Sequence, residues 1–164
     1  SLNGGISFLD DMTDPATSRT GYQQRGGPTA RTMEAMTRFP PVHSESLTAI
    51  AMSARLQVGQ RADASPLLAK GVALLAAKPP RWDEAAGSND FYYWYHGTRA
   101  LFLIQGEAWN AWRAAVLRAI VPHQSAQGDG AGSFAPADPW GDVGGRVYAT
   151  AINLLTLEIC ARRP

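Results

Sequence analysis

The chain has 164 residues, of which 45% are hydrophobic and 18% are charged, a composition typical of a globular domain with a hydrophobic core. The formal net charge is +1, which gives no reason to expect a nucleic acid or an anionic membrane surface as a partner. No apolar run approaches the roughly 20 residues of a membrane span, so we expect no membrane contact from this segment. Cys160 is the only cysteine, which excludes an internal disulfide and leaves the redox compartment open.

The first 43 residues are rich in turn formers and poor in helical periodicity, so we predict an irregular N-terminal arm over 1–43. The start has neither the basic nor the apolar region of a signal peptide, and it lacks Met. We therefore expect a piece of a longer protein. Within the arm, 6–9 and 19–22 are expected to pair as a short β-ribbon around the loop 10–17, and a short helix is expected at 31–36.

From Ser44 onward, apolar residues recur at helical spacing, and cap and breaker residues divide the chain into five predicted helices. These helices are expected to begin at Ser44, at Asp63 or Ser65, at Asn89 or Asp90, at Glu107 and at about Gly145. They are expected to end at Gly59, Pro79, Gly106, about His123 and Ala161. A loop at 125–143 is rich in Gly, Ala and Pro. The fold class predicted is all-α.

A similar segment recurs on the first, third and fifth of these helices, where Thr48, Thr98 and Thr150 lie 50 and 52 residues apart. A period of this length is typical of repeat architectures. The second and fourth helices carry more charge for a solvent face. The pattern therefore predicts stacked pairs of inner and outer helices.

Gln124, the turn Gly132-Ser133-Phe134, Trp140 and the segment 144–151 together resemble the α/α-toroid repeats of squalene–hopene cyclases and prenyltransferase β-subunits. In that family a Gln near the end of an outer helix precedes a Gly-x-Trp turn, which leads into the next inner helix; here Phe134 stands in the place of the Trp. Segment 90–98 looks like an inner-helix start of the same family. The resemblance covers about 44–161 and implies a partial α/α toroid of antiparallel helix hairpins in a domain over 44–164.

The departures from this family concern its chemistry. The Asp-x-Asp-Asp acid of the hopene-type cyclases is absent. Protein prenyltransferase subunits hold zinc with Asp, Cys and His, whereas here Cys160 stands alone near the end of the last helix. Five helices also make only part of a ring, which leaves an apolar concave face and an open edge that cost free energy unless covered. We expect the arm, another part of the parent protein, or a second copy to cover them.

Two groups of residues are candidates for a site. Asp10, Asp11 and Asp14 match the Asp-Asp-x-x-Asp string that binds magnesium and diphosphate in some isoprenoid enzymes, but Pro15 and the flanking turn residues favour a solvated loop, so we predict neither a metal nor a cofactor. The aromatic run 91–96 is expected to lie mostly in the core. The candidate pocket residues are Tyr92, Tyr95, His96, Arg99, Trp140 and Arg146.

Tyr92, Tyr95 and His96 are placed in this pocket because they share a helix face with Arg99. For Arg99 and Arg146, anion binding is one interpretation, and pairing with Glu158, Asp90 or Asp142 is the interpretation we favour. No complete catalytic set is present, so the leading hypothesis is a non-catalytic helical-repeat module that binds a protein segment or ligand on its concave face. A terpene cyclase- or prenyltransferase-like enzyme with an aromatic pocket for an isoprenoid is the first alternative. A glycan-active toroid domain is the second, and it would need two carboxylates near one pocket.

Overall fold

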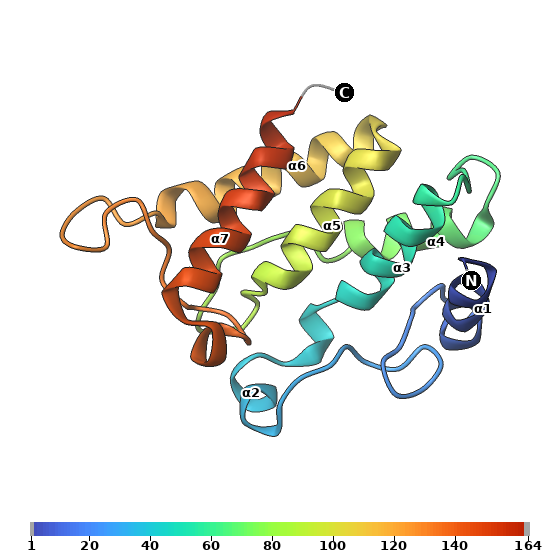
Figure 1. Ribbon diagram of the computed structural model, residues 1–164, viewed down its shortest axis with the longest axis horizontal. Coiled ribbons are helices and arrows are strands. Elements are labelled where there is room, and N and C mark those ends of the chain that lie inside the picture. Colours follow the sequence, from blue (N-terminus) through green and yellow to red (C-terminus); the bar gives the residue numbers. More distant parts are fainter. Residues whose placement is uncertain (1, 163–164) are drawn as a thin grey trace.

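The computed structural model describes residues 2–162, and these residues form seven α-helices and two short 3-10 helices without a strand, which confirms the all-α prediction (Figure 1). The elements are α1 (Leu2–Met12), α2 (Met33–Arg38), η1 (Pro41–His43), α3 (Ser46–Gln57), α4 (Pro66–Ala76), α5 (Phe91–Ile104), α6 (Gly106–Ile120), η2 (Val121–His123) and α7 (Gly141–Ala161).

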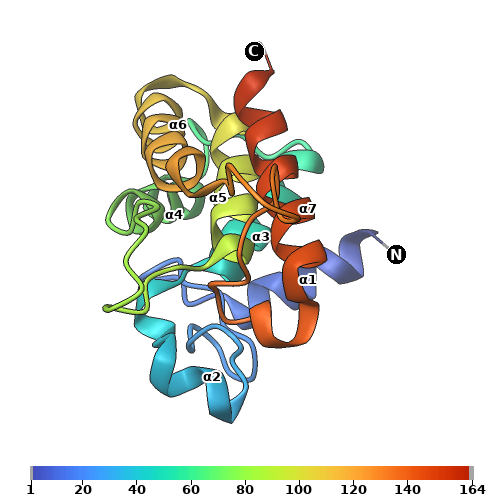
Figure 2. The ribbon, with the colours of Figure 1, turned by 90° about the vertical axis from the view of Figure 1, so that its left-hand side faces the viewer.

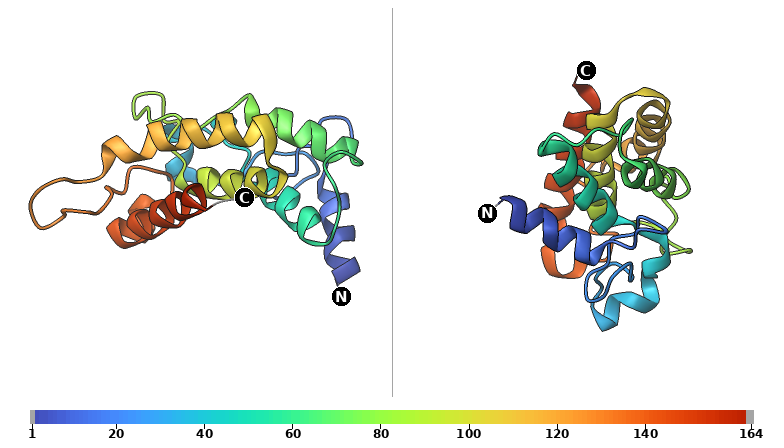
Figure 3. Two further views of the ribbon diagram at one scale, coloured as in Figure 1. Left: turned by 90° about the horizontal axis from the view of Figure 1, so that it is seen from above. Right: turned by 90° about the vertical axis from the view of Figure 1, so that its right-hand side faces the viewer.

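The long helices form two layers. Helices α3, α5 and α7 lie side by side with α5 in the middle, and α4 and α6 cover one face of this layer (Figure 2). The layer of α3, α5 and α7 is curved, and its concave side faces away from α4 and α6 (Figure 3, left). These three helices carry Thr48, Thr98 and Thr150, so they are the ones that the sequence predicted to be inner. The partial α/α toroid itself stays a prediction.

Helix starts follow the predicted caps in two cases and depart from them in two others. Ser65 and Asp90 each accept a hydrogen bond from a backbone N–H in the first turn of α4 and α5. Helix α3 begins at Ser46, later than predicted, after a Glu45 whose side chain makes no cap bond. Helix α7 begins earlier than predicted, at Gly141, and Gly145 interrupts it with a φ of 62°, which glycine adopts without strain.

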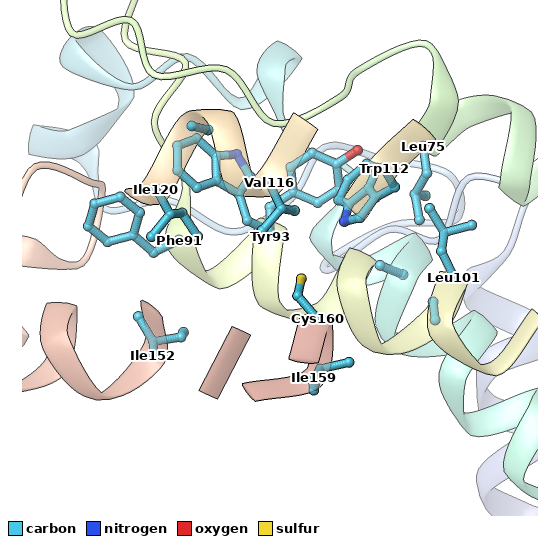
Figure 4. Close-up of a cluster of buried hydrophobic side chains, with 14 of the residues drawn as sticks. Leu75, Phe91, Tyr93, Leu101, Trp112, Val116, Ile120, Ile152, Ile159 and Cys160 are labelled. Atoms are coloured by element: carbon cyan, nitrogen blue, oxygen red, sulfur yellow. The ribbon is translucent and has the colours of Figure 1, made fainter. Parts of the chain in front are cut away.

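The core lies between the two layers and is largely aromatic (Figure 4). Phe91, Tyr93 and Trp94 of α5 are buried, as predicted for most of the aromatic run. Trp112 of α6 lies against Gly97, where a Cβ would come within 2.3 Å of the indole ring. The absence of a side chain at Gly97 therefore lets α6 approach α5 closely.

The recurring threonines hold neighbouring segments to the inner helices. The Oγ1 atoms of Thr48 and Thr150 accept hydrogen bonds from the backbone N–H groups of Thr20 (3.2 Å) and Phe134 (3.1 Å). Thr20 and Phe134 each take part in an isolated antiparallel bridge, with Thr13 and Gln124 respectively. Thr98 differs, because its Oγ1 accepts from the Trp112 Nε1–H at 3.0 Å. Each threonine thus fixes a different element to the same layer.

The N-terminal arm differs from the prediction. Residues 6–9 lie in α1, so the predicted β-ribbon is wrong, and the described part of the arm has only the single bridge between Thr13 and Thr20. The half-buried Ile6 and Leu9 share one side of α1, and Asp10 in its last turn forms an ion pair of 2.6 Å with the buried Arg55. These contacts with α3 favour a helix. The short helix predicted at 31–36 is α2, capped by Thr32.

Candidate functional site

Four of the predicted pocket residues lie along one side of α5. Tyr92, Tyr95, His96 and Arg99 are all half-buried, at spacings of three and four residues that place them on one helix face. The His96 ring lies between the two tyrosines, 4.4 Å from the Tyr92 ring centroid and 5.0 Å from that of Tyr95. The Arg99 guanidinium carbon lies 5.9 Å from the Tyr95 centroid, a cation–π contact. We call these four residues the α5 stripe.

A cleft of about 460 Å³ opens at the Tyr92 end of the stripe, and we call it the aromatic cleft. Its walls come from the arm, the start of α3, α5 and the start of α7, and they include Tyr22, Leu47, Tyr92, Trp140, Val143 and Tyr148. The Tyr92 and Trp140 ring centroids are 6.2 Å apart in an edge-on arrangement. The structure therefore brings Trp140 to Tyr92, as the candidate pocket requires.

A buried pair of carboxylates, which was not predicted from the sequence, lies beside the aromatic cleft. Asp90 forms an ion pair with Arg31 of the arm, and both side chains are only 2% exposed. Asp138 Oδ2 accepts hydrogen bonds from the Tyr148 hydroxyl (3.0 Å) and the Phe91 N–H (3.2 Å), and its Oδ1 accepts from the Trp140 N–H (3.3 Å). The glycan-active alternative needs such a pair of carboxylates near a pocket.

Burial controls the protonation of Asp138 and of its hydroxyl partner Tyr148. Burial, followed by the negative charge of Asp90, raises the pKa of Asp138 to about 7, against the hydrogen bonds that lower it. Burial and the Asp138 charge also raise the pKa of Tyr148 well above its usual value, so its hydroxyl stays protonated. Asp138 is therefore close to half-protonated at neutral pH.

A second cleft, of about 420 Å³, lies at the Arg99 end of the stripe, between α3, α5 and α7; we call it the cationic cleft. Its walls include Gln57, Tyr95, Arg99, Leu155, Glu158 and Arg162. Arg162 donates two hydrogen bonds to the Glu158 carboxylate, at 2.8 and 2.9 Å. Glu158 is thus occupied by the arginine one turn away on its own helix. The expected pairing of Arg99 with Glu158, Asp90 or Asp142 is not found among the described residues.

His96 lies between the two clefts and is a neutral ring at physiological pH. Burial, followed by the positive charge of Arg99, lowers its pKa to about 4. A histidine with this pKa does not act as a proton donor near neutrality. It contributes an uncharged, partly polar surface to the middle of the stripe.

Arg146 does not belong with these residues, and its assignment to the pocket is corrected. Its guanidinium donates to the Ser133 hydroxyl at 2.9 Å and lies 3.5 Å from that of Ser125, so it binds the loop before α7. It lines neither the aromatic cleft nor the cationic cleft. The expected ion pair between Arg146 and an acidic side chain is also not found among the described residues.

The three aspartates of the Asp-Asp-x-x-Asp string have separate partners. Asp10 pairs with Arg55, and Asp11 lies 3.8 Å from Arg25. Asp14 accepts hydrogen bonds from the Ala16 N–H and the Thr17 hydroxyl, which lower its pKa. Asp10 and Asp11 lie in the last turn of α1 rather than in the predicted loop. In residues 2–162, no three His, Cys, Asp or Glu side chains gather as a metal would require.

The remaining reactive side chains lie away from the clefts. Cys160 is buried, and burial raises the pKa of its thiol to about 11, so it is a poor nucleophile near neutral pH. His123 stacks on Trp82 with ring centroids 3.8 Å apart. Neither residue lines the aromatic cleft or the cationic cleft.

None of the helices within residues 2–162 has both the length and the hydrophobicity needed to cross a bilayer. Comparison with protein-family models, curated proteins and solved structures found no match to this chain.

Proposed function

We propose that this chain is a non-catalytic helical module that binds an apolar ligand or protein segment on the concave face of the α3–α5–α7 layer. The observation that carries the proposal is the α5 stripe, which joins the aromatic cleft at one end to the cationic cleft at the other. Half-buried aromatic side chains that converge on a cleft are typical of binding sites. This proposal needs no closed ring, because α5 supplies the whole stripe and the described residues supply the walls of both clefts.

The ionisable groups near the clefts are buried, paired or uncharged, and this favours binding over catalysis. Asp138 is 2% exposed, and its carboxyl group is already engaged by three donors of the chain itself. Asp90 is neutralised by Arg31, and His96 is held in its neutral form. A catalytic acid must reach the atom that it protonates. Tyr148 stands between Asp138 and the aromatic cleft, because it lines the cleft and donates to the carboxylate.

The carboxylate pair supports an enzyme as the second candidate. Two acids in one environment, one with a pKa near neutrality, form the arrangement that acid catalysis on a glycan or an alkene uses. In this alternative a movement of Tyr148 would open Asp138 to a substrate in the aromatic cleft. Substitution Tyr148→Phe distinguishes the two candidates, because it frees one lone pair of Asp138 without changing the shape of the cleft. If the chain is a binding module, this substitution leaves ligand binding unchanged. If the chain is an enzyme, the substitution changes its turnover rate.

Helix α7 carries exposed apolar side chains along its open edge, which a partner would cover. Val143 and Val147 are 84% and 83% exposed, and Leu154 is 48% exposed, on a helix whose other side packs on α5. We propose that another part of the parent protein or a second copy covers them. Sedimentation equilibrium separates these occupants. A dimer that Val147→Glu dissociates supports a second copy, whereas a monomer leaves the parent protein as the partner.

Binding on the concave face is tested with N-phenyl-1-naphthylamine, an uncharged fluorescent apolar probe. We expect its fluorescence to rise in the presence of the protein and the affinity to fall by about tenfold or more in Leu47→Asp, which places a charge in the aromatic cleft. Val121→Asp is the matched control, because Val121 is 53% exposed on η2, outside both clefts. Equal binding by the wild type and both variants would contradict the proposal.

A further inference from the structure

Arg99 has an unusual environment for a half-buried cation. It lies in the cationic cleft, and within residues 2–162 its guanidinium has neither a hydrogen bond nor an ion pair, only the cation–π contact with Tyr95 and the neighbouring His96 ring. The other half-buried or buried arginines named above have an anionic or hydrogen-bonding partner: Arg19 has Glu45, Arg31 has Asp90, and Arg55 has Asp10. A guanidinium removed from water without an anion loses solvation that one ring face does not restore.

The charges around the stripe leave this guanidinium uncompensated. Glu158 and Arg162 neutralise each other across one turn of α7, and Gln57 of α3 contributes an uncharged amide. His96 is neutral. At the other end of the stripe, Asp90 is paired with Arg31. The residues that line the cationic cleft therefore carry one net positive charge, at Arg99, beside rings and aliphatic side chains.

The size of the face indicates the kind of molecule that would fit it. Arg99 and Tyr92 are seven residues apart on α5, which corresponds to about 10 Å at a rise of 1.5 Å per residue. Between them lie the rings of Tyr95 and His96, and the aromatic cleft continues beyond Tyr92. A ligand with a planar anionic group at one end and an apolar body of this length would contact the guanidinium and the stripe together.

We propose that the concave face binds an amphipathic carboxylate, with the carboxylate on the Arg99 guanidinium and the apolar body along the α5 stripe toward the aromatic cleft. This inference rests on the proposed binding function and names the ligand class. Arginine suits the role because its planar group makes two parallel hydrogen bonds to a carboxylate, which lysine does not. The ring of Tyr95 keeps the guanidinium positioned for the ligand.

Isothermal titration calorimetry with decanoate and decanol tests the proposal, because these probes share an alkyl chain and differ in charge. We expect decanoate to bind about ten- to hundredfold more tightly, the ratio expected for a hydrogen bond to a charged group. Arg99→Gln should remove this preference, so that decanoate and decanol bind with equal affinity. Arg99→Lys should restore only part of it. Arg146→Gln, on the next inner helix and outside both clefts, should keep the full preference.

The imidazole of His96 gives a second readout within the same experiment. Because the charge of Arg99 lowers the pKa of His96, a carboxylate bound to Arg99 should raise that pKa toward its ordinary value, and decanol should not. Nuclear magnetic resonance titration of the ring protons measures it. This readout needs only the wild-type protein, so it holds even if an Arg99 variant does not fold.

The outcomes separate the two proposals. Equal affinity for decanoate and decanol, with no shift of His96, would overturn the carboxylate assignment and leave the apolar binding function standing. A preference for decanoate that persists in Arg99→Gln would overturn the role of Arg99. Absence of binding by decanoate, decanol and N-phenyl-1-naphthylamine would overturn both proposals.

Discussion

The Tyr148 hydroxyl donates a hydrogen bond of 3.0 Å to Asp138 Oδ2, and this bond joins α7 to the segment that precedes it. The same carboxylate oxygen accepts from the first N–H of α5. Asp138 therefore ties the starts of two inner helices together, while the neighbouring Asp90 ties α5 to Arg31 of the arm. The aromatic cleft lies where these elements meet, so its shape depends on a buried electrostatic cluster.

The raised pKa of Asp138 predicts a pH dependence of stability. In the unfolded chain this carboxyl has an ordinary pKa near 4, whereas in the folded protein the pKa is about 7. The folded state therefore binds more protons between these values, so this group stabilises the protein fully below pH 4, and its contribution declines as the pH rises to about 7. Relative to Asp138→Asn, we expect the wild-type free energy of unfolding to fall across this window, measured by urea denaturation at successive pH values.

His96 predicts the opposite slope in nearly the same window. Its folded pKa of about 4 lies below its unfolded value of 6.5, so its contribution is present above pH 6.5 and is lost as the pH falls toward 4. Relative to His96→Gln, the wild-type free energy of unfolding should therefore rise with pH over this range. The two effects partly cancel in the wild type, and only the paired variants reveal them. Parallel pH profiles for the wild type and both variants would contradict the prediction.

The candidate site could be predicted in part because helical spacing is a local property. The positions of Tyr92, Tyr95, His96 and Arg99 on one α5 face follow from their spacing alone. The role of Asp138 does not, because it depends on a loop of about twenty residues folding back onto the start of α5. A signal was available in the sequence: Asp138 is followed by Pro139 and Trp140, a sequence typical of an ordered turn. Arg31 gave no such signal, since its partner lies 59 positions away.

The buried ion pair of Arg31 and Asp90 predicts a large loss of stability when one partner is removed. We expect Arg31→Met to lower the free energy of unfolding by about 3–5 kcal/mol, because it leaves the Asp90 carboxylate buried without its cation. Asp90→Asn in the same chain should recover part of the loss, since Asn still caps α5. Chemical denaturation of the four proteins of this cycle measures the coupling energy.

The pair of Arg61 and Asp63 supplies the control for this experiment. Both side chains are exposed, at 74% and 64%, and their ion pair joins residues two positions apart. Arg61→Met should change the free energy of unfolding far less than Arg31→Met does, because solvent screens this pair. If Arg31→Met lowered the free energy of unfolding by an equally small amount, the buried pair would contribute no more to stability than a surface pair.

Replacement of Thr98 is expected to destabilise the protein more than replacement of another buried threonine. The Oγ1 of Thr98 accepts from the Trp112 Nε1–H and donates to the Trp94 carbonyl, so Thr98→Val leaves a buried indole donor without an acceptor. We expect a loss of about 1–3 kcal/mol. Thr156 is equally buried but donates only to the Ile152 carbonyl, so Thr156→Val should cost less. Thermal unfolding of the two variants compares them, and equal losses would contradict the role of the indole bond.

The boundaries of the helices show which parts of the fold could be predicted from sequence. Ser65 and Asp90 stand before helical runs and mark the starts of α4 and α5, because capping depends on side chains next to the helix end. Helix α1 was missed because its glycines indicated a turn, whereas its stability draws on the ion pair of Asp10 with Arg55, 45 residues away. Long-range partners of this kind leave no periodic signal in the sequence.

The close contact of Gly97 with Trp112 predicts that a methyl group added at position 97 would push the two helix layers apart. In Gly97→Ala the new Cβ would lie 2.3 Å from Cζ2 of Trp112, well inside van der Waals contact, and the indole is fixed by its bond to Thr98. Alanine favours a helix over glycine by about 1 kcal/mol, but overpacking of a core costs about 1–3 kcal/mol, so we expect a net loss of stability. Gly5→Ala is the matched control, since Gly5 lies in α1 with no atom within 4 Å of the added Cβ. It should leave stability unchanged or raise it slightly. Chemical denaturation of both variants, with the nuclear magnetic resonance signal of the Trp112 Nε1–H as the local readout, decides whether the close approach of α6 to α5 requires glycine.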